Sequence, residues 1–466
     1  MSLLALGALG TPICAIAQSQ PPPQTAQSTS SDSSANSDTD TTIFPHPDSE
    51  RFWVSGQANI IFQWHPSFPL KYRGPNSLSE AAQSATSHVV TLYTGLQVTN
   101  NTEVFLDLED STGTGIGNAL GLAGYTNLDV VRTAAGVPLS HAPYLARLLL
   151  RQIIPLSSAR VPAERSWLGL STSLPKRRLE FWVGKFTLPD FLDTNGPGSD
   201  SHLQFMNWTV DNNGAWDYAA NTRGYTDGAM LEYDDGRWSA RFVEALMPKV
   251  ANGIHLDADL ARARADNFEV DYHGGFLRHR EGAIRALAYL NHADMGNYRE
   301  AINDFLAGES AMPDIIATRR QGRHKYGLGF NFEQSLTDRI RAFGRWGWSD
   351  GRNESFAYTE VDRTLELGGD YRGDAWHRTN DRLGGAFSLN AISGDHRRYL
   401  ALGGIGFLLG DGALRYGREM IAEGYYTAHI WSGVFTSFDL QHINNPGYNQ
   451  DRGPVLCPGL RLHVDF

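Results

Sequence analysis

The chain has 466 residues, of which 41% are hydrophobic, 11% aromatic and 20% charged, and its formal net charge is -11. The negative charge disfavours nucleic acid as a partner. Beyond the first few positions no run of about 18 apolar residues occurs, which excludes membrane-spanning helices. The 48 glycines exceed the usual share of roughly 7% and suit tight turns and crowded strands.

The N-terminus has the pattern of an export signal. Residues 3–16 are apolar or small, and Ala15-Ile16-Ala17 fits a small-x-small cleavage site. We therefore predict a signal peptide over residues 1–17, although a basic first region is missing and an upstream start is an alternative. A buried N-terminal helix is a second alternative, which Pro12 disfavours. Residues 18–50 are rich in Gln, Pro, Ser, Thr and Asp and are predicted to be a disordered periplasmic leader.

Cysteine and lysine are both rare in this chain. Removal of the signal leaves Cys457 alone, so no intramolecular disulfide is possible. Almost all cationic charge is arginine, whose planar guanidinium holds hydroxyls and carboxylates in a fixed geometry. This bias suits a polar-lined pore, and a GC-rich genome would produce it equally well.

The C-terminal residues 460–466 alternate strictly between apolar and charged or titratable side chains, and the chain ends on Phe466. A strand with this pattern has one apolar and one ionic face. It fits an outer-membrane barrel, with lipid outside and water inside, or a soluble sandwich or propeller with one solvated face. A terminal phenylalanine resembles the signal read by the barrel-assembly machinery of Gram-negative bacteria.

Period-two alternation recurs along the chain and predicts about sixteen strands. We therefore predict an all-β fold over residues 51–466: a transmembrane antiparallel β-barrel of about sixteen strands with short loop helices. The helices are expected at 144–151, 256–265 and 298–306. The predicted strands are 52–64, 88–99, 102–109, 178–187, 226–234, 237–246, 266–274, 283–293, 323–334, 338–349, 364–373, 382–392, 397–408, 423–432, 434–443 and 458–466.

In several of these strands the charges are confined to one phase of the alternation. In 323–334, for example, Phe330 and Phe332 share one face while Lys325 and Glu333 lie on the other. An arginine or lysine facing lipid at mid-membrane costs about 2–4 kcal/mol, so this segregation favours the barrel over the soluble alternative. Tryptophans predicted near strand ends fit interfacial girdles: Trp64, Trp182, Trp238, Trp348 and Trp431.

Three segments together resemble the carbohydrate-selective porins of the OprB family. They are the front segment 73–78 (Arg-Gly-Pro-Asn-Ser-Leu), the central segment 211–228, which opens Asp-Asn-Asn-Gly-Ala-Trp-Asp-Tyr, and the C-terminal segment 441–454. The resemblance covers residues 51–466. It implies a sixteen-stranded channel in the outer membrane of a Gram-negative bacterium, for passive uptake of mono- and small oligosaccharides. A homotrimer is left open. The leucine-rich segment 139–156 departs from the family's pattern.

Candidate sugar contacts are the polar side chains on the inward phase of the strands. Sugars are recognised by hydrogen bonds to their hydroxyls and by aromatic rings against their apolar faces. Each such side chain has an alternative reading as solvated lumen wall, and the segment around Trp216 as a loop-shaping turn. The candidates are Gln57, Asn59, Arg241, Arg285, Arg341, Arg345, Asp439, Gln441 and Trp216, and Asp107, Glu109 and Arg461 share the inward phase.

Two other functions compete with sugar uptake. A barrel hydrolase is disfavoured because neither Gly-x-Ser-x-Gly nor His-Glu-x-x-His occurs, and we predict no enzymatic activity. An exporter of acidic polysaccharide would have a strongly arginine-biased lumen, whereas both signs of charge are predicted here. A general porin without sugar preference stays open. No metal or nucleotide cofactor is expected, because Cys/His clusters and phosphate-binding loops are missing.

Overall fold

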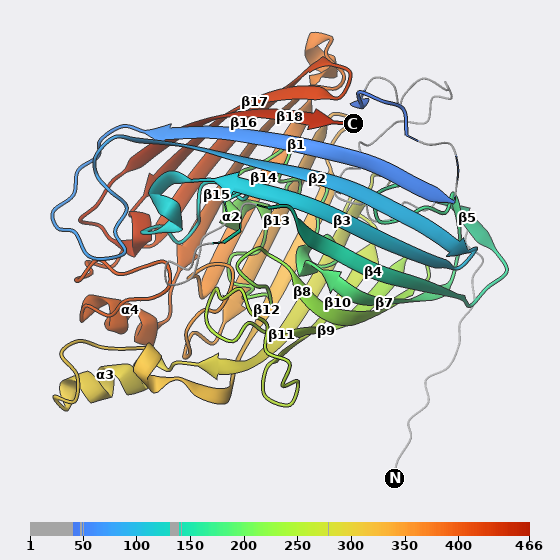
Figure 1. The fold of residues 1–466 in the computed structure, drawn as a ribbon. Helices are drawn as coiled ribbons and strands as arrows, with labels where there is room; N and C mark the ends of the chain where they lie inside the picture. The colour runs from blue at the N-terminus through green and yellow to red at the C-terminus, as the bar shows by residue number, and fades with distance from the viewer. Residues whose placement is uncertain (1–40, 47–48, 50, 131–138, 141, 278) are drawn as a thin grey trace.

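The computed structural model describes residues 41–46, 49, 51–130, 139–140, 142–277 and 279–466. Over these residues sixteen strands form one closed antiparallel barrel, and β5 and β6 form a separate two-stranded sheet (Figure 1). Each barrel strand pairs with its sequence neighbours, and β1 closes the ring against β18. The predicted fold class is confirmed.

The elements follow one another with strands dominating. The barrel strands are β1 (Phe52–His65), β2 (Gln83–Thr99), β3 (Thr102–Gly113), β4 (Tyr144–Pro155), β7 (Arg178–Phe186), β8 (Thr226–Asp234), β9 (Trp238–Leu246), β10 (Arg264–His273), β11 (Gly282–Met295), β12 (Arg320–Ser335), β13 (Ile340–Ser349), β14 (Arg363–Arg372), β15 (Arg382–Ala391), β16 (Glu419–Trp431), β17 (Val434–Asn444) and β18 (Val455–Asp465). The small sheet is β5 (Arg160–Pro162) with β6 (Ser173–Pro175). The helices are α2 (Trp208–Asp211), α3 (Tyr298–Leu306) and α4 (Gly394–Ala401), with short 3₁₀ turns η1 (Ile116–Ala119), η3 (Leu188–Asp190), η4 (Ile316–Thr318), η5 (Gly373–Trp376) and η6 (Pro446–Tyr448). Among the described residues, none of the helices has the length and hydrophobicity that a membrane-spanning helix requires.

The C-terminal residue completes the closure of the barrel. The Phe466 amide donates to the Gly56 carbonyl at 2.8 Å, and the Gly56 amide donates back at 2.5 Å. Strands β1 and β18 continue this pairing in register from Gln57 opposite Asp465. A closed ring leaves no unpaired strand edge, which a bilayer would not tolerate.

The two ends of the barrel differ in the length of their connections. At one end, here called the turn end, β2–β3 and β16–β17 are joined by the residues 100–101 and 432–433. At the other, here called the loop end, the connections 187–225 and 392–418 are long and α3 and α4 lie outside the barrel mouth (Figure 1). Both the start of β1 and the C-terminus lie at the turn end, as expected for an outer-membrane barrel with short periplasmic turns.

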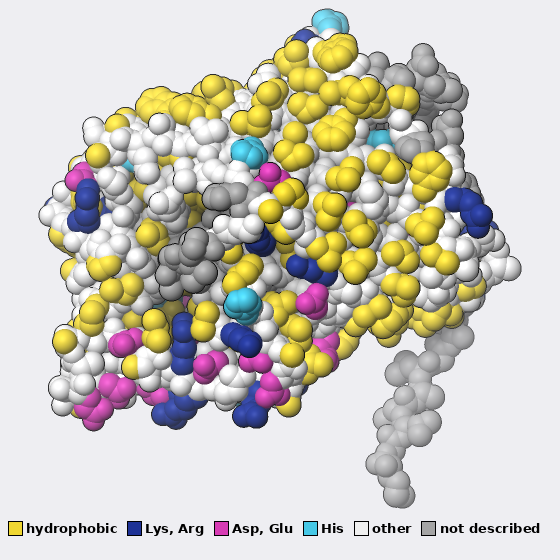
Figure 2. Space-filling model, in the orientation of Figure 1, with side chains coloured by type: hydrophobic (Ala, Val, Ile, Leu, Met, Phe, Trp, Pro, Cys, Tyr) yellow, Lys and Arg dark blue, Asp and Glu magenta, His cyan; other side chains and the backbone are white. Residues whose placement is uncertain are grey.

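The outer face of the barrel is apolar. Phe268, Leu367 and Leu460 are 47%, 53% and 54% exposed, while their sequence neighbours Glu269 and Arg461 point inward and are buried. Figure 2 shows hydrophobic side chains spread along the flank of the barrel. The predicted phase of the alternation is therefore confirmed for these strands, with apolar side chains toward lipid and ionic ones toward the lumen.

Two predicted elements exchange identity in the structure. The predicted helix 144–151 lies in strand β4, and the predicted strand 397–408 covers the second part of α4 and the turns that follow it. These two errors offset each other, so the count of sixteen strands is still right. The predicted helix 256–265 is also wrong, because residues 256–263 form turns and irregular chain and 264–265 begin β10, whereas 298–306 is α3 as predicted. Trp182 is not a girdle residue, since its indole is buried inside the barrel.

The predicted signal peptide, residues 1–17, lies outside the described residues, as does most of the predicted leader 18–50. Of the leader, 41–46 and Ser49 are described. The Ile43 amide donates to the Asp465 carbonyl at 2.9 Å, so this part of the chain lies against the C-terminal strand.

Candidate functional site

The connection 187–225, here called the inward loop, folds into the barrel and is bound to its wall. Arg345 of β13 donates to the Val210 carbonyl at 2.8 Å and to Ser199 Oγ at 2.5 Å. Arg461 of β18 donates to the carbonyls of Ser201 and Gln204 at 2.9 and 2.8 Å. The wall arginines thus satisfy loop carbonyls that have no partner in a helix or sheet.

Wall carboxylates bind the amides of the inward loop in the same way. Glu423 of β16 accepts from the Met206 amide at 2.6 Å, and Glu269 of β10 accepts from the Asp193 amide at 2.8 Å. A buried amide left without a partner costs about 1–3 kcal/mol, so each of these contacts fixes the path of the loop. The loop is therefore a built part of the lumen wall.

Three cavities lie between the inward loop and the wall. The loop-end cavity has a volume of about 90 Å³, the central cavity about 180 Å³ and the turn-end cavity about 140 Å³. Tyr218 and Arg223 line both the loop-end and the central cavity, and Asp190 lines both the central and the turn-end cavity. The cavities therefore follow one another from the loop end toward the turn end of the barrel.

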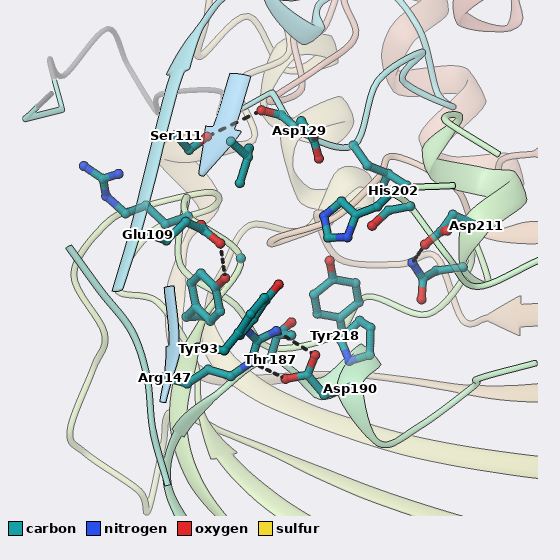
Figure 3. A pocket seen from close by; sticks show the side chains of 18 residues that line it. Tyr93, Glu109, Ser111, Asp129, Arg147, Thr187, Asp190, His202, Asp211 and Tyr218 are labelled. Carbon is teal, nitrogen blue, oxygen red and sulfur yellow. Dashed lines mark hydrogen bonds and ion pairs between the residues drawn. The ribbon is translucent and has the colours of Figure 1, made fainter. Parts of the chain in front are cut away.

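Polar side chains point into the central cavity from several elements (Figure 3). Arg147 of β4 forms a bidentate pair with Asp190, with Nε and Nη2 at 2.7 and 2.8 Å from the two carboxylate oxygens. On another side of the cavity, the Tyr225 hydroxyl donates to Glu109 at 2.8 Å. His202 and Tyr218 also border the cavity. The cavity thus combines hydrogen-bond donors and acceptors with aromatic rings.

An aromatic row follows the loop-end cavity toward the central one. Trp208 and Tyr358 stack with centroids 5.5 Å apart and planes 11° apart. The ring centroids of Tyr358 and Tyr218 are 4.8 Å apart, and those of Tyr218 and Trp216 are 5.2 Å apart. Trp208, Tyr218 and Tyr358 all line the loop-end cavity. The row offers ring surface along one side of the passage.

The central cavity has an excess of carboxylates over basic groups. Glu109, Asp129, Asp190 and Asp211 line it, against the guanidinium groups of Arg147 and Arg223. Asp129 accepts from Asn59 Nδ2 at 2.5 Å, and burial raises the pKa of its carboxyl to about 6. Burial also raises the pKa of Asp211 well above its usual range, and one oxygen of its carboxyl has no hydrogen-bond partner among the described residues.

The predicted strand contacts all lie inside the barrel, but they do not form one site. Of the nine candidates only Arg241 borders one of the three cavities, the turn-end cavity. Most of the others bind inward-folded chain or pair with wall residues on the same or a neighbouring strand. Gln57 bonds Thr91, Asn59 bonds Asp129, Arg241 pairs with Asp271, Arg285 with Glu333 and Arg341 with Asp370, Arg345 bonds the inward loop, and Gln441 bonds the Thr126 carbonyl and Asp439. Their direct contact with sugar stays a prediction.

Trp216 lies inside the barrel with the rest of segment 211–218. Its indole is 1% exposed, and Nε1 donates to Asn267 of β10 at 2.9 Å. In this arrangement the indole anchors the inward loop to the wall. The neighbouring ring of Tyr218 is the one that borders two cavities.

Arg147 and Asp190 form an ion pair at the boundary between the central and turn-end cavities, and neither was among the predicted site residues. Arg147 lies in the segment 144–151, which was predicted to be a helix. However, Arg147, Leu149 and Arg151 are two residues apart, the spacing of side chains on one face of a strand. Asp190 follows Leu-Pro in a connection, where no periodicity operates. Neither residue carries a local motif.

Comparison with known proteins decides the family. A family model described as carbohydrate-selective porin, OprB family, matches residues 75–466. The chain belongs to the OprB family. It is accordingly an outer-membrane porin of Gram-negative bacteria selective for carbohydrates, and a channel, not an enzyme.

Solved structures share the fold of this OprB-family chain at low identity. The high-pH structure of Pseudomonas putida OprB aligns with a TM-score of 0.66 at 15% identity, over 90% of this chain and 94% of that one. The outer-membrane channel DcaP of Acinetobacter baumannii aligns with a TM-score of 0.50 at 10% identity, over 89% and 97%. No curated protein matches the sequence.

Proposed function

We propose that small neutral sugars cross this porin by passive diffusion through the three cavities in turn. The observation that carries the proposal is the sharing of lining residues: Tyr218 borders the first two cavities and Asp190 the last two. A solute leaving one cavity therefore meets a side chain of the next. Each cavity is small, which favours single sugars over long chains.

The lining suits sugars because it replaces the hydrogen bonds that a sugar makes with water. Carboxylates such as Glu109 accept from hydroxyls, and guanidinium and hydroxyl groups such as those of Arg223 and Tyr225 donate to them. The half-buried ring of Tyr218 presents apolar surface to the C–H face of a pyranose. Sites that combine aromatic rings with a few fixed polar groups set the orientation of a ligand.

The charge balance of the central cavity argues against acidic polysaccharide as the solute. The Arg147 guanidinium is already paired with Asp190, which leaves Glu109 and Asp129 against Arg223, so the cavity has no excess of positive charge to offset the hydration that an anion would lose. Neutral sugars meet no such penalty.

Liposome swelling tests the proposed selectivity. Vesicles containing the porin are exposed to hexoses, to uronic acids of similar size, and to amino acids matched in size. The proposal expects hexoses to enter fastest and uronic acids slowest. Equal rates for hexoses and size-matched amino acids would leave a general porin.

Two partner predictions belong to the same proposal. Phe466, at the end of β18, is proposed as the signal for the barrel-assembly machinery, so its deletion should lower the amount of heat-modifiable barrel in the membrane. A homotrimer is proposed as the assembly, and a native mass of a single barrel in mild detergent would contradict it.

A further inference from the structure

The connection between β4 and β7, residues 156–177, is unlike the other connections at the turn end. It is the longest described connection there, and it contains the small sheet of β5 and β6, which projects at this end in Figure 1. We refer to residues 156–177 as the turn-end hairpin. Turns at the periplasmic end of outer-membrane barrels are usually short, so a long connection with its own sheet at this end is unusual.

The tip of the turn-end hairpin folds back into the barrel. Ser166 and Gly169 close the tip, with the Ser166 amide donating to the Gly169 carbonyl at 2.7 Å and the Gly169 amide donating back at 3.2 Å. Leu170 behind the tip is fully buried, and its side chain occupies the space where a side chain on Gly95 of β2 would lie. The tip is therefore packed as part of the core.

A wall carboxylate fixes the tip in place. Glu103 of β3 accepts from the amides of Leu170 and Ser171 at 3.2 and 3.1 Å and from the Ser171 hydroxyl at 3.1 Å. The same carboxylate pairs with Arg151 of β4 at 2.9 Å. Three donors from one short segment to one buried acceptor leave the tip little freedom.

This anchoring places the Trp167 indole under Arg147. The Arg147 guanidinium carbon lies 4.5 Å from the Trp167 ring centroid and 5.4 Å from that of Tyr225, which belongs to the inward loop. Trp167 also contacts Tyr93 of β2, with ring centroids 5.2 Å apart. Arg147 therefore joins the hairpin from the turn end to the loop that enters from the loop end.

Trp167, Arg147 and Asp190 together lie between two cavities. Arg147 lines the central cavity, Trp167 lines the turn-end cavity, and Asp190 lines both. Tyr93 lines the central cavity and its ring contacts the ring of Trp167, which lines the turn-end cavity. Trp167 is 8% exposed and lies against Tyr93 and Arg147, so its indole occupies part of the boundary between the two cavities.

We infer that Trp167, carried by the turn-end hairpin, is a specificity-determining residue that sets the upper size limit for sugars on the periplasmic side of the passage. The inference rests on the proposed route through the three cavities. The Trp167 ring packs against the Arg147 guanidinium and so holds the Arg147–Asp190 pair in position. It also occupies space on the turn-end side of that pair. The periplasmic hairpin thereby controls a selectivity that the extracellular loops do not set alone.

The test compares Trp167→Ala with Trp167→Phe in reconstituted channels. Single-channel conductance in potassium chloride is measured first, followed by liposome swelling with mono-, di- and trisaccharides. We expect Trp167→Ala to raise the conductance and to lose the discrimination between mono- and trisaccharides, and Trp167→Phe to stay close to wild type. Trp238→Ala is the matched control, because Trp238 is 48% exposed on the outer face near the same end.

The outcomes separate this inference from the proposed function. Normal heat-modifiable mobility shows that the Trp167→Ala barrel has assembled. If such a barrel keeps the wild-type conductance and size limit, the inference is overturned. If that variant does not assemble, Trp167→Leu keeps apolar volume without the ring, and wild-type behaviour in it would overturn the inference equally. A wild-type channel without preference for sugars over amino acids would refute the proposed function, while the conductance comparison in salt would still decide the role of Trp167.

Discussion

Arg345 of β13 and Asp193 of the inward loop form an ion pair, with Nε and Oδ2 3.0 Å apart and both side chains buried. The pair links a strand that spans the membrane to a chain segment inside the lumen. Arg345 also bonds the Val210 carbonyl and pairs with Glu366 at 3.3 Å. Its guanidinium therefore acts chiefly as an anchor of the inward loop.

Removal of that anchor should destabilise the barrel and widen the passage. Arg345→Ala leaves the Asp193 carboxylate buried without its partner, and breaking one side of a buried pair costs about 3–5 kcal/mol. We expect a lower urea midpoint for loss of heat-modifiable mobility, together with higher and noisier single-channel conductance. Arg280→Ala is the control, because Arg280 pairs with the 92% exposed Asp338 at the turn end. Exposed pairs contribute roughly 0–1 kcal/mol. Equal midpoints for the two variants would contradict the anchoring role.

The sequence predicts which strand faces point inward, but not what covers them. The lipid imposes the alternation, so Arg345 and Gln441 could be placed on the lumen side from their neighbours alone. Their partners, the Val210 and Thr126 carbonyls, lie 135 and 315 residues away in the chain and carry no matching sequence signal. For this reason the inward phase was predictable, while the difference between anchor and sugar contact was not.

Strand β4 shows where the alternation itself fails. Leu149 points inward, yet it is apolar because it packs in one buried cluster with Phe105 and with Leu170 of the turn-end hairpin. Leu148, Leu149 and Leu150 therefore form an unbroken apolar run that resembles a helix face. For α4 a local signal was present, since Ser393 caps the His396 amide at 3.1 Å and Asp395 lies in the first turn.

Tyr218 should contribute to sugar recognition through its ring. An aromatic pair contributes about 0.5–1.5 kcal/mol of interaction free energy. If a sugar stacked on the Tyr218 ring gains the same free energy, Tyr218→Ala weakens sugar binding by roughly two- to tenfold. Sugar-induced block of the ion current measures this affinity. Tyr326→Ala is a matched control on the lipid face, where Tyr326 is 40% exposed, and it should leave the affinity unchanged. Wild-type affinity in Tyr218→Ala would show that sugars avoid the aromatic row.

The ion selectivity of the channel should depend on pH through Asp129. Burial raises the pKa of this carboxyl from 3.8 to about 6, so it is neutral below that pH and negative above it. Because Asp129 lines the central cavity, cation selectivity should rise as the pH increases through about 6. The raised pKa also means that the folded state binds this proton more tightly, so its contribution to stability is present below about pH 4 and declines toward pH 6.

Reversal potentials in a salt gradient at about pH 5 and about pH 7.5 measure this change. Asp129→Asn should lose part of the shift, whereas Asp338→Asn, at a fully solvated position of the turn end, should keep it. A full wild-type shift in Asp129→Asn would assign the titration to another group.

Blocking the proposed route through the three cavities is the most direct test of whether sugars take it. Ser201→Cys places a thiol at the central cavity, while Ser84→Cys places one on the exposed outer side of β2. Hexose uptake by liposomes is then measured before and after reaction with a bulky thiol reagent. We expect uptake to stop in Ser201→Cys and to continue in Ser84→Cys. Undiminished uptake through a fully modified Ser201→Cys barrel would contradict the proposed route, because the sugar would then be passing elsewhere.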